Sequence, residues 1–371
     1  NEFYNMEKDF KMVATTMFGL EGVLAKELAN LGAKEVTEAV RSVSFKGDTG
    51  FLYKANIALR TAIRILKPIK VTKIYDEEDL YDAVKKVKWE KYLDIDGTFA
   101  IGAVSNSVNL PNHSHYIALK SKDAIADYFR DKFGKRPDVD VAYPDLKIHI
   151  HIKNDYLTIS LDSSGDSLHK RGYRTATNIA PINEVLAAGM VLLSGYRGEE
   201  NLIDPMCGSG TILIEAGRRF GNHSTFVTSP WIFERWNMVW AVAESSVSTT
   251  GVRLLGSDRD GPSVAKALQN ADTSGVQLEI VESNVRDLNS EMFPNLPETG
   301  VIVCNPPYGM GSGRKTDAVY HWLGQTYRTH FSKWRLYFIA TDSHKARLVS
   351  KEAKSIAQFS NAGIPVTLYQ V

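Results

Sequence analysis

The 371-residue sequence contains only two cysteines, Cys207 and Cys304. Two thiols offer neither a disulfide framework nor the ligand spacing of a zinc site, which favours a reducing compartment such as the cytoplasm and gives no reason to expect a metal. The sequence also lacks any apolar run of about eighteen residues, so we expect no membrane span. Its formal net charge is only +1, which excludes a broadly basic nucleic-acid-binding domain and leaves local patches as the means of holding RNA or DNA.

The signature of phosphate-binding loops is absent as well. No G-x-x-x-x-G-K-[ST] motif occurs, so ATP hydrolysis has no support. The composition, 43% hydrophobic and 23% charged, is that of an ordinary globular protein. A chain of this length predicts two or three domains.

The most informative motif is Asn305-Pro306-Pro307-Tyr308-Gly309, which follows the apolar run 301–304. That run predicts a buried strand that ends at the motif. The Asn305 carboxamide oxygen and the Pro306 carbonyl can each accept an N–H bond from a planar exocyclic amino group, while the Tyr308 ring stacks on a base turned out of its helix or loop. The prolines stiffen the turn and place these acceptors in advance. An Asn-Pro turn that merely closes a strand is the alternative.

A second motif, Asp204-Pro205-Met206-Cys207-Gly208-Ser209-Gly210-Thr211, stands between a short apolar strand and the helical run 212–216. An acid at a strand end, followed by glycines two apart at the start of a helix, describes the first βα turn of a nucleotide-binding sheet. Gly208 and Gly210 would let the backbone approach a ligand closely, although such glycines often serve only packing. The third glycine of the dinucleotide fingerprint is missing, which argues against NAD.

The order of the predicted strands distinguishes between cofactors. An apolar strand over 252–258 ends in Asp258, at the position where an acid holds a ribose diol. A third strand over 278–284 follows, and the strand before Asn305 would be the fourth. The glycine loop (204–211), the ribose-binding acid Asp258 and the motif 305–309, which we call the amino clamp motif, therefore follow one another along the chain. This is the order of parts in class I S-adenosylmethionine (SAM) methyltransferases. D-P-M-C-G-S-G-T followed by N-P-P-Y resembles the members that modify adenine N6 or guanine N2.

This resemblance implies a role for each matching residue. Asp204, Gly208 and Gly210 would hold the methionine end of SAM, and Asp258 its ribose hydroxyls. Asn284 stands where relatives commonly have an aspartate that accepts from the adenine amino group; its oxygen can still accept, and Asp287 could substitute unless it is a helix cap or a solvated acid. The predicted cofactor-binding set is Asp204, Cys207, Gly208, Gly210, Thr211, Asp258, Asn284 and Asp287, and the predicted catalytic set is Asn305, Pro306, Pro307 and Tyr308. We expect both cysteines to be packing residues rather than nucleophiles.

The first 165 residues show no catalytic constellation and have the pattern of an α+β structure suited to recognition. Periodicity predicts strands over 12–15, 36–40, 42–46, 98–104, 146–152 and 156–161, and helices over 19–31, 50–59, 80–87 and 115–133.

Nearly the whole chain resembles THUMP-containing RNA methyltransferases. Residues 10–32 resemble their N-terminal ferredoxin-like domain, 69–161 occupy the place of the THUMP domain, 161–174 match the domain junction, and 361–370 match the terminal strand pair. The resemblance implies a ferredoxin-like domain over 1–68, an RNA-binding THUMP domain over 69–165, and a Rossmann-like class I methyltransferase domain, with a mostly parallel seven-stranded sheet, over 166–371.

Two basic clusters are candidates for RNA contact. The first lies on or after the predicted helix 115–133, and the second lies in the junction between the halves. They consist of Lys120, Lys122, Lys132 and Arg136, and of His169, Lys170, Arg171 and Arg174. A solvated helix face is the alternative for the first cluster, and a packed linker for the second. Trp231 and Trp236 could stack on RNA, although core packing is favoured for them.

The sequence therefore predicts a cytoplasmic enzyme that uses SAM, and no metal, to methylate the N2 amino group of a guanine in structured RNA. The bacterial enzymes that it resembles most act on 23S ribosomal RNA. Because the clamp recognises an amino group rather than a ring, N6-adenine methylation of RNA or DNA stays open, as does a transfer-RNA substrate. A non-enzymatic alternative, an RNA-binding ribosome-assembly factor with a decayed site, rests on Asn284 alone. The sequence does not indicate an oligomeric state.

Overall fold

The computed structural model describes residues 8–107, 110, 113–175, 181–218, 252–308 and 313–371. Gly309 of the amino clamp motif, Trp231 and Trp236 lie outside the described residues. Three units follow one another along the chain, and two sheets run through them. Within the described ranges, no helix combines the length and the apolar character needed to cross a membrane.

The N-terminal unit packs two helices on one face of an antiparallel sheet. Met12, Ala14 and Phe45 alternate with more exposed residues and form the core beneath the helices. The elements are β1 (Phe10–Thr15), α1 (Glu21–Leu31), β2 (Lys34–Ala39), β3 (Ser42–Gly47), α2 (Thr49–Ala58) and β4 (Arg64–Lys73). All of these except β4 agree with the expected elements to within a few residues.

Strand β4 escaped the sequence analysis for a physical reason. Its sequence, R-I-L-K-P-I-K-V-T-K, has no clean alternation and contains Pro68, and a proline inside a run argues against a strand. In the structure the register of β4 against its neighbour shifts between Pro68 and Lys70, so the missing N–H falls at an irregularity of the ladder. The expected domain boundary after residue 68 lies inside this strand.

The middle unit continues the same sheet. Its elements are α3 (Glu77–Lys85), the 3₁₀ helix η1 (Trp89–Lys91), β5 (Thr98–Asn106), α4 (Ser114–Phe133), β6 (Asp138–Val139), β7 (Leu146–Lys153) and β8 (Tyr156–Asp162). Strand β4 pairs with β1 through its first residues and with β8 through the rest, which gives one eight-stranded sheet in the order β2-β3-β1-β4-β8-β7-β5-β6. Ile148, Ile150 and Ile152 of β7 are fully buried in the same core as the apolar residues of α3 and α4.

The C-terminal unit is a seven-stranded sheet in the order β11-β10-β9-β12-β13-β15-β14. The first five of these strands are parallel, and β14 and β15 form an antiparallel pair at one edge. This confirms the predicted Rossmann-like, mostly parallel sheet. The elements are α5 (Glu184–Leu193), β9 (Leu202–Asp204), α6 (Thr211–Gly217), β10 (Leu254–Asp258), α8 (Gly261–Ser274), β11 (Glu279–Glu282), η2 (Ser290–Met292), β12 (Val301–Cys304), α9 (Gly313–His330), β13 (Arg335–Ala340), α10 (Ser343–Val349), β14 (Lys354–Asn361) and β15 (Ile364–Gln370).

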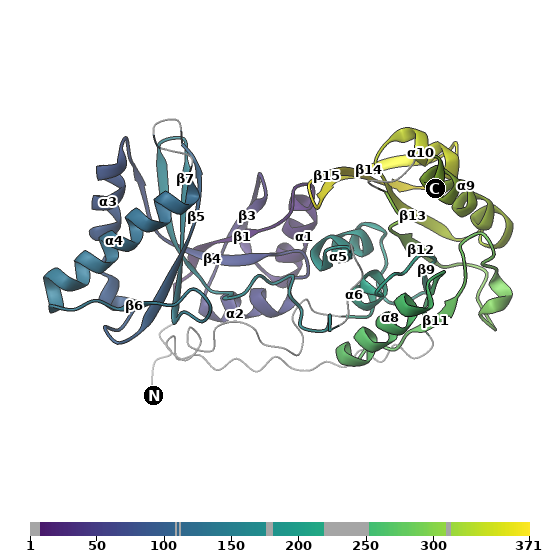
Figure 1. Ribbon diagram of the computed structural model, residues 1–371, viewed down its shortest axis with the longest axis horizontal. Helices are drawn as coiled ribbons and strands as arrows, with labels where there is room; N and C mark the ends of the chain where they lie inside the picture. Colours follow the sequence, from purple (N-terminus) through teal and green to yellow (C-terminus); the bar gives the residue numbers. More distant parts are fainter. Residues whose placement is uncertain (1–7, 108–109, 111–112, 176–180, 219–251, 309–312) are drawn as a thin grey trace.

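Figure 1 shows an elongated molecule, with α3 and α4 at one end, the seven-stranded sheet at the other and the N-terminal unit between them. The N-terminal and C-terminal units meet around Glu215 of α6, whose side chain is fully buried. Its carboxylate lies 3.3 Å from Arg171 Nε and accepts a hydrogen bond of 2.9 Å from the Tyr173 hydroxyl, while Arg60 of the N-terminal unit donates to the Glu215 carbonyl.

These contacts correct one prediction. Arg171 is 1% exposed, and its guanidinium also donates to the carbonyls of Leu168 and Arg60. A guanidinium whose donors are engaged inside the protein cannot reach an RNA phosphate, so the expected RNA contact of Arg171 is wrong. The packed-linker alternative holds for this residue.

Candidate active site

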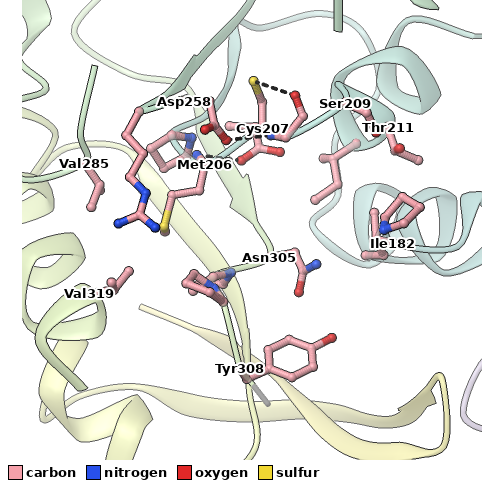
Figure 2. A pocket seen from close by; sticks show the side chains of 18 of the residues that line it. Ile182, Met206, Cys207, Ser209, Thr211, Asp258, Val285, Asn305, Tyr308 and Val319 are labelled. Carbon is pink, nitrogen blue, oxygen red and sulfur yellow. Dashed lines mark hydrogen bonds between the residues drawn. The ribbon is translucent and has the colours of Figure 1, made fainter. Parts of the chain in front are cut away.

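A cavity of about 800 Å³ opens at the carboxyl ends of β9, β10 and β12. Because the carboxyl ends of parallel strands meet at one edge of a sheet, the glycine loop, Asp258 and the amino clamp motif line the same cavity although they are far apart in sequence. Figure 2 shows Asp258 and Cys207 on one side of this cavity and Asn305 and Tyr308 on the other.

The glycine loop takes a conformation that needs its glycines. Gly208 and Gly210 have φ of 51° and 82°, in the left-handed region that side chains disfavour. The loop is tied to β10 by a hydrogen bond from the Cys207 N–H to the Ser257 carbonyl at 2.9 Å. A Cβ on Gly210 would also lie 3.1 Å from the Cβ of Ala267 in α8. Gly210 therefore packs against α8, whereas Cys207, Gly208 and Ser209 line the cavity, and α6 starts from the loop at Thr211.

Two acids stand at the wall of the cavity in different surroundings. Asp204 is 1% exposed, and burial raises the pKa of its carboxyl to about 8, helped by the charge of Asp258 and opposed by a 3.1 Å bond from the Met206 N–H. Asp258 is partly exposed in the cavity and accepts from the N–H groups of Gly208, at 2.9 Å, and Asp260, at 3.0 Å. These bonds fix the Asp258 carboxylate while leaving lone pairs for a ligand.

The remaining predicted cofactor residues fall inside and outside the cavity. Asn284 lines it and accepts from the Arg286 N–H at 3.0 Å. Asp287 is exposed, pairs with the Arg286 guanidinium at 3.2 Å and is not among the lining residues, which favours the solvated-acid alternative; its role as a substitute for Asn284 stays a prediction. Cys207 and Thr211 line the cavity and are buried, and burial raises the pKa of the Cys207 thiol, which suits a packing residue.

The amino clamp motif presents an unpaired acceptor. Asn305 Oδ1 is buried and has no hydrogen-bond partner among the described residues. Leaving a buried acceptor unpaired costs about 1–3 kcal/mol, and such atoms usually mark a ligand or a water site. Pro306 is buried and Pro307 exposed, whereas Tyr308 is half-buried and faces the cavity.

Asn361 is among the lining residues that sequence reasoning missed. Asn361, at the end of β14, lines the cavity and donates from Nδ2 to the Tyr308 hydroxyl at 2.6 Å. The available signal was the turn Asn361-Ala362-Gly363 within the terminal strand pair, where a polar side chain ends a strand. Among the described residues, no group of three His, Cys, Asp or Glu side chains is placed to hold a metal ion.

None of the basic residues expected to contact RNA lines the cavity. On α4, Lys122 pairs with Asp123 at 3.0 Å, Lys132 pairs with Glu90 at 2.5 Å, and Lys120 lies 5.7 Å from the ring centre of Tyr81.

Exposure differs among the other predicted RNA contacts. Arg136 and Lys170 are exposed, and His169 is half-buried with its Nδ1 at 2.6 Å from Ser167 Oγ. Arg174 donates to the Ile182 carbonyl and to Thr211 Oγ1 and pairs with Glu184, so its predicted RNA contact is corrected to a structural role behind the glycine loop.

Comparison with known protein families covers almost the whole chain. Residues 171–370 match a family model described as the RMKL-like methyltransferase domain, residues 75–162 match the THUMP domain, and residues 11–66 match the RlmL ferredoxin-like domain.

Individual relatives extend over the same length. A ribosomal RNA large subunit methyltransferase K/L from Syntrophotalea carbinolica is 35% identical over 385 residues, which cover 98% of this chain and 53% of that protein. A Synechocystis sp. protein that carries the provisional name RNA methyltransferase is 33% identical over 369 residues, covering 96% of this chain and 94% of that protein. The chain thus spans about half the length of the K/L relative.

Solved structures share the arrangement of all three units. The protein SMU.472, provisionally described as a methyltransferase and crystallised with SAH, has a TM-score of 0.80 and 28% identity over 98% of both chains. A Listeria monocytogenes protein described as a predicted N6-adenine-specific DNA methylase has a TM-score of 0.77 and 28% identity over 98% of this chain and 96% of its own. The methyltransferase family model matches more than half of the sequence, and the relatives match almost all of it. The glycine loop and the amino clamp motif also line one cavity. The chain therefore belongs to the RMKL-like methyltransferases, with ferredoxin-like and THUMP domains before the methyltransferase domain.

Proposed function

We propose that the protein transfers a methyl group from SAM to the exocyclic N2 amino group of a guanine in 23S ribosomal RNA. The observation that carries this proposal is the buried Oδ1 of Asn305, which lies in the same cavity as the glycine loop and finds no hydrogen-bond partner within the described ranges. A planar amino group is a donor that would satisfy this atom. The family and the SAH bound to SMU.472 support the cofactor, and the names of the K/L relatives support the ribosomal substrate.

The residues of the cavity fit SAM. Asp204 and Gly208 line the cavity and Gly210 follows in the same loop, and these three residues would hold the methionine end. The fixed carboxylate of Asp258 would accept from the ribose hydroxyls, and the side chain of Asn284 would face the adenine. Cys207 and Thr211 would complete the wall. SAM, when bound, supplies a methyl group that its sulfonium already activates, so no metal is needed.

The amino clamp motif would then act by positioning. Asn305 Oδ1 and the Pro306 carbonyl would accept the two amino hydrogens and fix the nitrogen toward the methyl group, while Tyr308 stacks on the base and Pro307 stiffens the turn. Because the acceptors stand in place before the base arrives, little reorganisation is required at the moment of transfer. A base turned out of its helix or loop is needed to reach this cavity.

We assign RNA capture to residues 1–68 and 69–165, and methyl transfer to 166–371. An RNA substrate of this size, together with two reduced cysteines, favours a cytoplasmic enzyme. On this assignment the proposed RNA contacts are Lys120, Lys122, Lys132, Arg136, His169 and Lys170.

One alternative has an observation in its favour. The Listeria protein of similar structure is described as N6-adenine-specific, and the clamp contacts an amino group that adenine also has. The decayed-site alternative is disfavoured because Asp204, Asp258 and Asn305 all stand at the cavity.

The test uses the full chain, labelled SAM and ribosomal RNA from cells that lack this modification. We expect label in N2-methylguanosine of the large-subunit RNA. Label in N6-methyladenosine would move the function to the alternative, and label in transfer RNA alone would keep the chemistry and change the substrate. A dissociation constant of 1 mM corresponds to a binding free energy of about −4 kcal/mol. If calorimetry detects no binding of SAM near 1 mM, the proposal that the protein is an enzyme is refuted.

A further inference from the structure

Strand β7 separates apolar and basic side chains onto opposite faces of the eight-stranded sheet. Its isoleucines are fully buried beneath α3 and α4. Since successive side chains of a strand point to opposite faces, Lys147, His149, His151 and Lys153 lie on the other face. Figure 1 shows α3 and α4 on the outer side of β5 and β7, which leaves this face turned toward the rest of the molecule. We call it the open face.

The register of the sheet adds neighbours to these four residues. Tyr156 of β8 stands opposite Lys153, and Lys73 of β4 stands opposite Tyr156. Gly102 of β5 stands opposite His149, so the centre of the open face carries little side-chain bulk. Tyr156 is 53% exposed, which leaves its ring available for stacking. The open face therefore combines cations, imidazoles and an aromatic ring.

The charges of the open face are less compensated than those of the helical side. Asp162 is paired with Arg64 at 2.6 Å and Asp155 with Lys73 at 3.0 Å. In the part of the chain that the structure describes, Lys147 and Lys153 have no acidic side chain within ion-pair distance. On α4, by contrast, Lys122 and Lys132 are paired with acids, as described above.

His149 provides an independent sign of a ligand. Its Nδ1 is buried, and no hydrogen-bond partner for it lies in the part of the chain that the structure describes. Burial, reinforced by the charges of His151, Arg64 and Lys147, lowers the pKa of the imidazole to about 4, so the ring is neutral near pH 7. A neutral imidazole offers one donor and one acceptor, which suits a ribose hydroxyl or a base edge.

We propose that the open face, formed by Lys147, His149, His151, Lys153 and Tyr156, binds a single-stranded or looped segment of the RNA substrate. This rests on the proposed function for the identity of the RNA. Lys147 and Lys153, at the two ends of β7, would contact phosphates, and Tyr156 would stack on a base. The lysines of α4, already paired with acids, contribute less than the sequence suggested.

The test compares two double variants of the full chain. One is Lys147→Gln with Lys153→Gln, and the matched control is Lys85→Gln with Lys135→Gln, two lysines of the helical side that pair with Asp131 at 2.7 Å and with Asp96 at 2.6 Å. Binding to unmodified large-subunit RNA is measured by filter retention across a salt series. We expect the open-face variant to bind about tenfold more weakly at low salt and to lose about 1.5 from the magnitude of the log–log salt slope, while the control changes less than twofold. SAM affinity should be equal in all three proteins.

Two results decide between the possible failures. If the open-face variant binds RNA as wild type does, or if the control loses as much RNA affinity, the proposed RNA-binding role of the open face is overturned. This holds whether or not methyl transfer is seen. If wild type transfers no methyl group to RNA, the proposed function fails, and the binding comparison still decides the surface.

A second inference rests on the contact between Asn361 and Tyr308. The Asn361 amide donates to the Tyr308 hydroxyl at 2.6 Å from a turn whose Ala362 and Gly363 both have left-handed φ. The turn fixes where Asn361 points, and Asn361 in turn limits rotation of the ring that would stack on the base. We infer that Asn361 is a positioning residue that acts through Tyr308.

A double-mutant cycle tests this inference. Asn361→Leu and Tyr308→Phe should each lower kcat about two- to tenfold, and the double variant should be no slower than the slower single variant, because both changes remove the same bond. SAM affinity should stay within twofold. If the fold-losses in kcat of the two single variants multiply in the double variant, Asn361 acts on the substrate by another route. If SAM affinity falls as much as kcat does, the role of Asn361 is structural. Either outcome overturns the inference.

Discussion

Replacing Asn305 by alanine should separate activity from stability. The variant loses an acceptor placed before the base arrives, and the loss of one such group typically costs a factor of about 10²–10³ in kcat, or about 2.7–4 kcal/mol. The same change removes a buried oxygen for which the described part of the chain supplies no hydrogen-bond partner. Because the unpaired acceptor itself costs about 1–3 kcal/mol, the penalty for truncating the side chain is offset, and we expect the stability to stay within about 1 kcal/mol of wild type.

Asn270 supplies the matched control. It is fully buried like the Asn305 oxygen, but its amide donates to the Ser209 carbonyl at 3.1 Å and accepts from the Thr175 N–H at 3.1 Å. Asn270→Ala leaves both backbone groups without these partners, so it should cost about 2–4 kcal/mol. Urea midpoints of the free proteins and single-turnover methyl transfer at saturating SAM measure the two effects. The reasoning is refuted if Asn305→Ala loses as much stability as Asn270→Ala, or if it keeps more than a tenth of the wild-type rate.

Three further predictions concern other parts of the chain. Asp204 is neutral below its pKa of about 8 in the free protein, whereas the unfolded carboxyl ionises near 3.8, so stability from this group is fully present below about pH 4 and is lost as pH rises toward 8. Since a cationic ligand favours the ionised form, SAM affinity should rise from pH 6 to 8 in calorimetry, and Asp204→Asn should bind more weakly without this trend. Gly19→Ala, at φ 91° and with its Cβ 1.9 Å from the Gln358 carbonyl oxygen, should lower the urea midpoint clearly more than Gly32→Ala, which has φ 101° and open space; equal shifts would show that backbone strain alone matters. Arg171→Met should cost about 3–5 kcal/mol because Glu215 stays buried without its partner, and a thermal midpoint equal to that of wild type would contradict the buried pair.

The sequence predicted the parts of the site that are local in the chain. Asp204 ends β9 and Asn305 follows β12, and in each case an apolar run, a special residue and a turn stand within a few positions. Such signals depend on backbone chemistry that a short segment carries by itself. The order of these segments then predicted which strand ends would meet.

What the sequence left out depends on contacts between distant residues. Asn361 and Tyr308, which form a hydrogen bond, lie 53 positions apart in the sequence. Arg171 is buried against Glu215, which lies 44 positions away in the sequence. No local pattern distinguishes an arginine that will be buried from one that will meet a phosphate. Strand β4 was not predicted because Pro68 is a local signal against a strand. In the structure, pairing with the neighbouring strands outweighs that signal.

The course of β4 limits how the enzyme can move. Its ladder joins β1 on one side and β8 on the other, so the ferredoxin-like and THUMP domains cannot rotate against each other without breaking hydrogen bonds of a continuous sheet. The two domains therefore form a single arm of fixed length, whose far end is separated from the cavity by the whole N-terminal unit (Figure 1). If the proposed function holds, an arm of fixed length would select a target nucleotide by its distance from a second RNA element as well as by its base.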